Sequence, residues 1–126
     1  MKNSLNHAGR SLLALYFLVP GVMKFIAWDM HVALMEKHAM IMVPVLLAIA
    51  ATAQILASIS LLANRNVVVC ALGLAVMVLL INFNLHDFWN YTDLEAAHET
   101  QNFVKNLGIF AGLLLLASMN MKEPSA

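Results

Sequence analysis

The chain has 126 residues, of which 62% are hydrophobic and 11% charged, and its formal net charge is zero. An average soluble protein is roughly 45–50% apolar and about 25% charged, and a soluble fold this short could not bury so much apolar surface. The balanced charge also argues against nucleic acid as a partner, because such binding depends on clustered Lys and Arg. Cys70 is the single cysteine, so an internal disulfide is excluded. We therefore expect one domain, over residues 1–126, in a lipid bilayer.

Four apolar stretches are about long enough to cross a bilayer, which takes about 20 residues of helix. They cover about 11–28, 40–63, 67–83 and 103–119. Each is too long for a strand, and Gly, Ala and Ser recur inside them, as close packing of membrane helices requires. The first stretch follows Lys2 and Arg10 as a signal peptide would, but residues 20–25 offer no small-x-small cleavage site, so we interpret it as an uncleaved span. The sequence predicts an all-α bundle of four transmembrane helices.

The charges on either side of these spans predict the orientation. Four spans put both termini and the short 64–66 turn on one side, and this turn is short enough to make an antiparallel hairpin of the second and third spans. That side carries Lys2, Arg10, Arg65 and Lys122 against Glu123. The opposite side carries Lys24, Lys37 and Lys105 against Asp29, Glu36, Asp87, Asp93, Glu95 and Glu99. Because positive charge favours the cytoplasmic side, we expect both termini in the cytoplasm.

A few polar residues lie inside the spans. Lys24 is about one turn inside the outer end of the first span, where an ammonium is costly unless it reaches the headgroups or meets an acid. It either snorkels to the headgroups or faces a cavity, with Asp87 as a candidate partner. In the second span, Gln54 and Ser58 are one turn apart and are expected to hydrogen-bond between helices.

His86, Asp87 and Trp89 directly follow the third span. An adjacent His and Asp can act as an acid–base pair or hydrogen-bond a ligand carbonyl. In the alternative interpretation Asp87 caps the next segment and Trp89 anchors it at the membrane interface.

The same connection holds Glu95 and His98, at the i, i+3 spacing that di-metal helical bundles use. Those sites need a second such pair and two further Glu from other helices, which the spans do not supply. We therefore expect a solvated polar loop here and no metal site.

Asn102, Lys105 and Asn106 open the fourth span, and the two asparagines share one face at i, i+4. Amides and an ammonium in the outer leaflet need partners, and the acids of the 84–99 segment are the obvious ones. The group forms either a ligand or partner site, or a structural network that ties the connection to the helix.

Five segments together show a family resemblance. They are Arg10 with residues 12–15, Gly21-Val22-Met23-Lys24-Phe25, Leu61-Leu62 before Arg65, His86-Asp87-Phe88-Trp89, and Asn102-Phe103-Val104-Lys105-Asn106-Leu107-Gly108. In this order they resemble DoxX-family membrane proteins over nearly the whole chain. The resemblance implies a four-helix protein of the bacterial inner membrane, in a group named after a subunit associated with thiosulfate:quinone oxidoreductase. Where we would expect an acid in the second helix, this chain has Gln54, whose amide cannot carry a proton.

The leading functional expectation is an accessory subunit of a membrane redox system, with a quinone-contacting or partner-docking site at the outer face. The candidate residues are Lys24, His86, Asp87, Trp89, Asn102, Lys105 and Asn106. A quinone needs an apolar slot between helices and one or two polar groups at its carbonyls. The chain has no haem ligand pair inside the spans and no flavin fingerprint, so we expect no covalently bound cofactor. Any oxidoreductase activity would then need a redox-enzyme partner.

Two other functions fit the same pattern. The first is a non-enzymatic assembly or scaffold subunit whose polar outer surface docks a partner. The second is a small transporter, although comparable exporters depend on an acid in their first span and none occurs between Ser11 and Trp28. Four short helices bury only a thin core, so a homo-oligomer or a docked partner is a further expectation.

Overall fold

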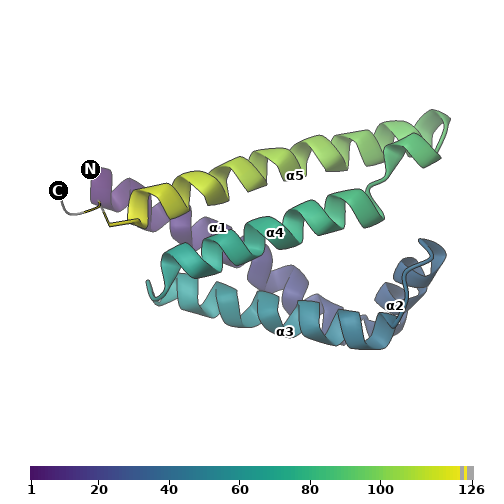
Figure 1. The fold of residues 1–126 in the computed structure, drawn as a ribbon, viewed down its shortest axis with the longest axis horizontal. Coiled ribbons are helices and arrows are strands. Elements are labelled where there is room, and N and C mark those ends of the chain that lie inside the picture. The colour runs from purple at the N-terminus through teal and green to yellow at the C-terminus, as the bar shows by residue number, and fades with distance from the viewer. Residues whose placement is uncertain (123, 125–126) are drawn as a thin grey trace.

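The computed structural model of the chain describes residues 1–122 and 124. Its helices are α1 (Lys2–Ile26), α2 (Trp28–Lys37), α3 (Val43–Leu62), α4 (Val67–Leu85) and α5 (Asp93–Asn120), with a short 3-10 turn, η1 (Phe88–Asn90), before α5. Over the described residues there is no strand, and α1, α3, α4 and α5 are the helices long and apolar enough to cross a membrane. The prediction of an all-α, four-span protein is confirmed (Figure 1).

The helices form two pairs, because α1 packs mainly on α3 and α4 packs mainly on α5. The start of α1, the end of α5 and the α3–α4 turn lie at one end, which we call the hairpin end (Figure 1). Helix α2 and the α4–α5 connection lie at the other, which we call the loop end. The two pairs are close together at the hairpin end and diverge toward the loop end. A cavity lined by residues of both pairs lies between them.

The α3–α4 turn makes the antiparallel hairpin that its length indicates. Asn64 and Asn66 adopt left-handed backbone conformations, with φ of 56° and 51°. Asn tolerates this conformation better than most residues, so the tight reversal is compatible with the sequence. The Arg65 N–H donates to the Ser60 carbonyl at 2.8 Å and closes the end of α3.

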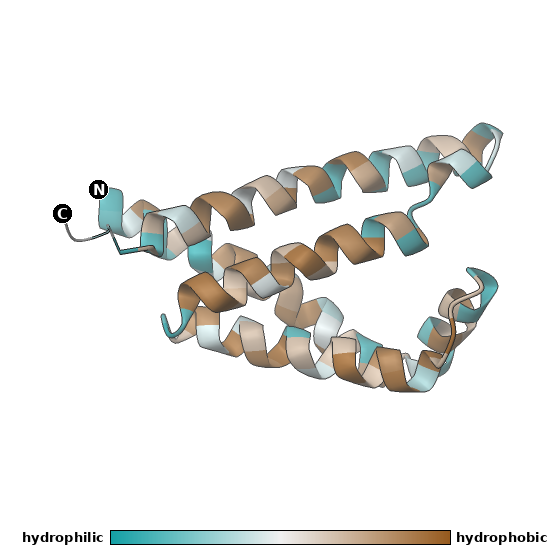
Figure 2. Ribbon diagram, in the orientation of Figure 1, coloured by the Kyte–Doolittle hydropathy of each residue, from teal (hydrophilic) through white to brown (hydrophobic). Residues whose placement is uncertain are grey.

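The apolar core lies between the helices, mostly toward the hairpin end. Its fully buried members come from α1, α3, α4 and α5 and include Ala14, Leu61, Ala71, Leu74 and Leu113. Large apolar side chains also point outward, and Ile49, Val69 and Leu115 are 62%, 74% and 65% exposed. Figure 2 shows these apolar spans between hydrophilic ends. An outward apolar surface of this extent is explained by contact with lipid.

Helices α1, α4 and α5 extend at one end or both beyond the apolar stretches that predicted them, whereas α3 lies within the predicted 40–63 stretch. Helix α1 begins at Lys2 rather than near residue 11, and α5 begins at Asp93 rather than near residue 103. The segment 29–39, which separates the first two predicted spans, is largely helix α2. The hydrocarbon core limits the apolar stretch to about 30 Å but does not limit the helix, and the 28 residues of α5 extend about 42 Å. Glu123, which entered the charge argument, lies outside the described residues.

Candidate functional site

A cavity of about 240 Å³ lies between the two helix pairs, and we call it the inner cavity. Its lining comes from four helices and the residue after α4: Tyr16, Phe17, Pro20 and Lys24 of α1, Gln54 of α3, Val78 and Ile81 of α4, His86, and Asn102, Lys105 and Asn106 of α5. Most of the predicted site residues therefore meet in one place. Phe17, Val78 and Ile81 give this polar cavity apolar walls.

The inner cavity is cationic. Lys24 is half-buried and Lys105 is exposed, and both side chains line it. Among residues 1–122 and 124, no Asp or Glu lies within 4.0 Å of either ammonium. The suggested Lys24–Asp87 pair is therefore absent from this part of the chain. Two cations without a bonded carboxylate favour a ligand atom that carries negative charge or lone pairs.

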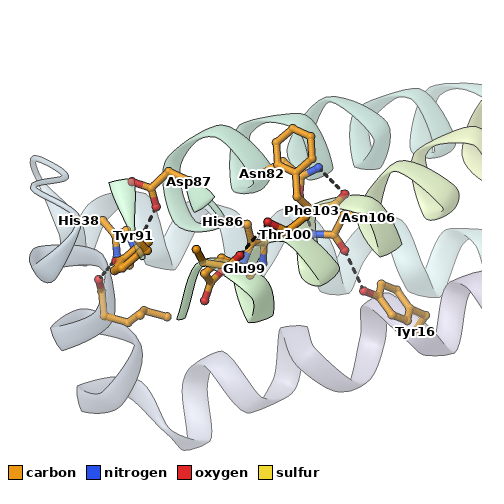
Figure 3. A network of polar contacts seen from close by, with 12 residues as sticks. Tyr16, His38, Asn82, His86, Asp87, Tyr91, Glu99, Thr100, Phe103 and Asn106 are labelled. Carbon is orange, nitrogen blue, oxygen red and sulfur yellow. Dashed lines mark hydrogen bonds and ion pairs between the residues drawn. The ribbon is translucent and has the colours of Figure 1, made fainter. Parts of the chain in front are cut away.

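A chain of amide hydrogen bonds orients one wall of the inner cavity (Figure 3). Asn82 is fully buried, and its Nδ2 donates to the Phe103 carbonyl at 3.1 Å. Asn106 Nδ2 donates to Asn82 Oδ1 at 2.9 Å, and the Tyr16 hydroxyl donates to Asn106 Oδ1 at 3.4 Å. Because the first acceptor is a backbone carbonyl, the donors and acceptors of the whole chain are fixed. These bonds connect α1, α4 and α5.

His86 and Glu99 form a close pair at the end of the inner cavity. His86 Nδ1 lies 2.6 Å from Glu99 Oε2, and the two side chains are 24% and 22% exposed. His86 comes just after α4, whereas Glu99 lies two turns into α5 (Figure 3). A carboxylate accepts hydrogen bonds only, so Nδ1 carries the proton that it donates to Glu99. The Nε2 atom of a neutral His86 ring is then an acceptor.

Of the two residues expected to hydrogen-bond between helices, Gln54 does so and Ser58 instead bonds within its own helix. Gln54 Nε2 donates to the Phe17 carbonyl of α1 at 2.7 Å, whereas Ser58 Oγ donates to the Gln54 carbonyl within α3 at 2.6 Å. Gln54 is 3% exposed, and its Oε1 has no hydrogen-bond partner among the described residues. A buried acceptor left unpaired is costly, and this one belongs to a residue that lines the inner cavity.

Asp87 and Trp89 do not line the inner cavity, although they closely follow His86 in sequence. Asp87 Oδ1 lies 3.4 Å from His38 Nε2, and the same nitrogen is 3.0 Å from the Tyr91 hydroxyl. These contacts join the end of α2 to the segment after α4. The Trp89 ring packs edge-on against Phe88 and Phe103, at centroid distances of 5.2 and 6.2 Å. Trp89 thus packs within the turn between α4 and α5, whereas Asp87 is the N-cap residue of η1 but makes no capping hydrogen bond.

Glu95 and His98 lie in helix α5 and not in a loop, and both line a second cavity at the loop end. This loop cavity has a volume of about 350 Å³ and is also lined by Lys37, His38, Tyr91 and Glu99. Among the described residues, no group of three or more His, Cys, Asp or Glu side chains is arranged to hold a metal ion.

Several polar residues that the structure places at or near the site were not predicted individually. Glu99 was one acid among several, and Tyr16 and Asn82 were not candidates. The signal for Glu99 is its spacing, because Glu99, Asn102 and Asn106 fall on one face of a helix. That signal is readable only if the helix begins well before residue 99, as α5 does.

Comparison with known proteins gives a family. The family model DoxX matches residues 5–87, well over half of the chain. The match covers α1 to α4 and includes Lys24, Gln54 and His86, and it ends before α5. No curated protein and no solved structure matches the chain. With its four helices able to cross a membrane, the chain is a multi-pass membrane protein that belongs to the DoxX family.

Proposed function

We propose that this protein is a quinone-associated accessory subunit of a membrane redox system, and that the inner cavity takes the quinone headgroup. The observation that carries the proposal is the lining of this cavity. It combines two lysines, two asparagines and a histidine with the apolar side chains Phe17, Val78 and Ile81. A quinone headgroup is a flat apolar ring with an oxygen at each end, so it needs both kinds of surface.

The charges of the cavity suit the chemistry of quinone oxygens. These oxygens accept hydrogen bonds, and they gain negative charge when the ring is reduced. Lys24 and Lys105 are donors without an acidic partner within 4.0 Å among the described residues. Ammonium groups near developing negative charge stabilise the charged form, most strongly where the site is shielded from water. The side chains of Asn102 and Asn106 add neutral hydrogen-bonding groups.

The helix packing offers the isoprenoid tail a route into the lipid. Helices α1 and α5 contact each other much less than α1 contacts α3 or α4 contacts α5. The bond between Tyr16 and Asn106 crosses this weakly packed seam beside the inner cavity. An apolar tail that left the cavity between α1 and α5 would therefore enter the bilayer without disrupting either helix pair.

The electrons in this proposal come from a partner enzyme. The loop end is the surface for its docking, because α2, η1 and the start of α5 place acids and histidines there. Affinity purification from native membranes in mild detergent should recover a redox enzyme in stoichiometric amount. Recovery of the protein alone would contradict the accessory role, and quinone binding would then be tested independently of it.

Quinone binding is tested with the purified protein in lipid nanodiscs, titrated with a short-chain ubiquinone analogue. Lys24→Gln and Lys105→Gln should each weaken binding about tenfold, because a hydrogen bond to a charged group contributes about 1.5–3 kcal/mol. Lys37→Gln is the matched control, since Lys37 lines the loop cavity. Equal affinities for all four proteins would refute the proposed headgroup site.

A further inference from the structure

The His86–Glu99 pair stands between two cavities. His86 lines the inner cavity, and Glu99 lines the loop cavity. The 2.6 Å bond between His86 Nδ1 and Glu99 Oε2 joins them (Figure 3). Since Glu99 takes up Nδ1, the nitrogen that remains for a ligand in the inner cavity is Nε2. Among the described residues the hydrogen bond of the His86 ring is the one through Nδ1, and Nε2 makes none.

The tautomer of His86 follows from Glu99. A carboxylate has lone pairs and no proton to give, so it stabilises the ring form that carries its proton on Nδ1. In that form Nε2 is a hydrogen-bond acceptor. A hydrogen bond at one ring nitrogen fixes the tautomer and the orientation of catalytic histidines in the same way.

A second acceptor in the inner cavity is also unpaired. Gln54 Oε1 is buried without a partner in the described part of the chain. Its orientation is fixed, because the amide Nε2 donates to the Phe17 carbonyl at 2.7 Å and a flipped amide would set two oxygens against each other. Gln54 belongs to α3 and His86 follows α4, so the two acceptors come from different helix pairs. The inner cavity thus offers two acceptors from separate walls, and both lack a donor.

We propose that the inner cavity selects the reduced, hydroxyl-bearing quinol over the oxidised quinone, with His86 Nε2 and Gln54 Oε1 accepting from its two hydroxyls and Glu99 as the positioning residue for His86. This inference rests on the proposed function, because it takes the ligand to be a quinone. A quinone and its quinol both accept hydrogen bonds from Lys24 and Lys105. Only the quinol also donates, and a bound quinone would leave the buried Gln54 Oε1 and the partly buried His86 Nε2 unpaired.

The preference is measured with three forms of one short-chain analogue under anaerobic conditions: the quinol, the quinone, and the quinol with both hydroxyls methylated. The wild-type protein in nanodiscs should bind the quinol at least about tenfold more tightly than either of the others. The dimethyl ether keeps the oxygens and the ring but donates no hydrogen bond, so it isolates the effect of donation. Equal affinities for quinol and quinone would overturn the inference while leaving the proposed headgroup site in place.

The role of Glu99 is measured separately. Glu99→Gln should reduce the quinol preference severalfold, because an amide can accept from Nδ1 or donate to it and so allows both tautomers. Glu99→Asp should restore part of the preference. Glu95→Gln is the matched control, since Glu95 lies one turn earlier in α5, and the quinol preference should be unchanged.

A spectroscopic readout on the wild-type protein keeps this test independent of ligand affinity. In wild-type protein labelled with ¹⁵N-histidine, and with the His86 signals identified by His86→Gln, Nε2 should show the shift of an unprotonated ring nitrogen. A protonated Nε2 on a neutral ring would overturn the assigned role of Glu99. If neither quinol nor quinone binds while Nε2 is unprotonated, the proposed function fails and the selectivity fails with it.

Discussion

Three buried polar residues of the bundle share one kind of bond. Arg10 Nε donates to the Leu61 carbonyl at 2.8 Å, Gln54 Nε2 to the Phe17 carbonyl, and Asn82 Nδ2 to the Phe103 carbonyl. Each bond runs from a side chain of one helix to the backbone of another. Such bonds hold helices together where water is scarce. The donor must be a polar side chain, whereas any residue can supply the backbone carbonyl that accepts.

Arg10 offers the clearest test of what such a bond contributes to stability. The side chain is 5% exposed and joins α1 to the last turn of α3. Arg10→Met should lower the free energy of unfolding by about 1–2 kcal/mol, near the low end of values for charged donors, because the Leu61 carbonyl keeps the Asn64 N–H at 3.1 Å. The measurement is equilibrium denaturation in detergent. Arg65→Met, at the exposed hairpin turn, is the control and should change the free energy of unfolding by less than about 0.5 kcal/mol.

The sequence locates most of the inner cavity but not its hydrogen bonds. Lys24, His86, Asn102, Lys105 and Asn106 are polar residues at helix ends on one side of the membrane, and this placement is enough to predict that they lie near one another. Asp87 follows His86 directly, yet it faces His38 because the chain turns at the end of α4. Such a turn depends on backbone angles that the spacing of apolar residues does not record.

At the scale of elements, the apolar stretches indicate where the membrane is rather than where the helices end. The start of α5 had a local signal, because Thr92 and Glu95 have the spacing of a capping box. In the structure Thr92 is the N-cap residue with an extended backbone, but its side chain makes no capping hydrogen bond. Composition alone suggests that the polar first turns of α5 are a loop. They are helical, and this places Glu99 next to His86.

The contact between α1 and α3 depends on Gly21. A Cβ atom added there would lie 3.0 Å from Ile55 Cγ1 and 3.4 Å from Gln54 Cγ. At Gly73 of α4, an added Cβ would meet nothing within 4 Å. Gly21→Ala should therefore destabilise the bundle by about 1–3 kcal/mol through overpacking, whereas Gly73→Ala should be neutral or stabilising by up to about 1 kcal/mol. Denaturation of both variants under the same conditions compares them, and equal effects would contradict the close packing at Gly21.

At the scale of the whole molecule, the two helix pairs behave as layers joined at the hairpin end and separated at the loop end. A groove of about 500 Å³ between α3 and α4 opens from this separation, and it is lined almost entirely by apolar side chains such as Met35, Ile49 and Val76. The inner cavity lies in the same separation, between α1 and α5, and Ile81 lines both spaces. Polar and apolar ligand surfaces therefore both result from the divergence of the pairs.

The orientation of this arrangement in the membrane is a prediction from charge. The start of α1, the end of α5 and the α3–α4 turn lie at the hairpin end, with Lys2, Arg65 and Lys122, so this end should face the cytoplasm. Single cysteines at Asn64 and Thr92, in a Cys70→Ser background, place a thiol at either end of the bundle. In sealed vesicles with the cytoplasmic face inside, a membrane-impermeant thiol reagent should label the cysteine at position 92 and not the one at 64.

Two controls make the labelling decisive. Detergent permeabilisation should expose both cysteines, which shows that a missing label reflects sidedness rather than burial, and vesicles of the opposite orientation should reverse the pattern. Labelling at 64 alone in the first vesicles would place the loop end in the cytoplasm. The redox partner that we propose to dock there would then have to be a cytoplasmic protein, because α2 and the polar start of α5 are the surface that the bundle presents at that end.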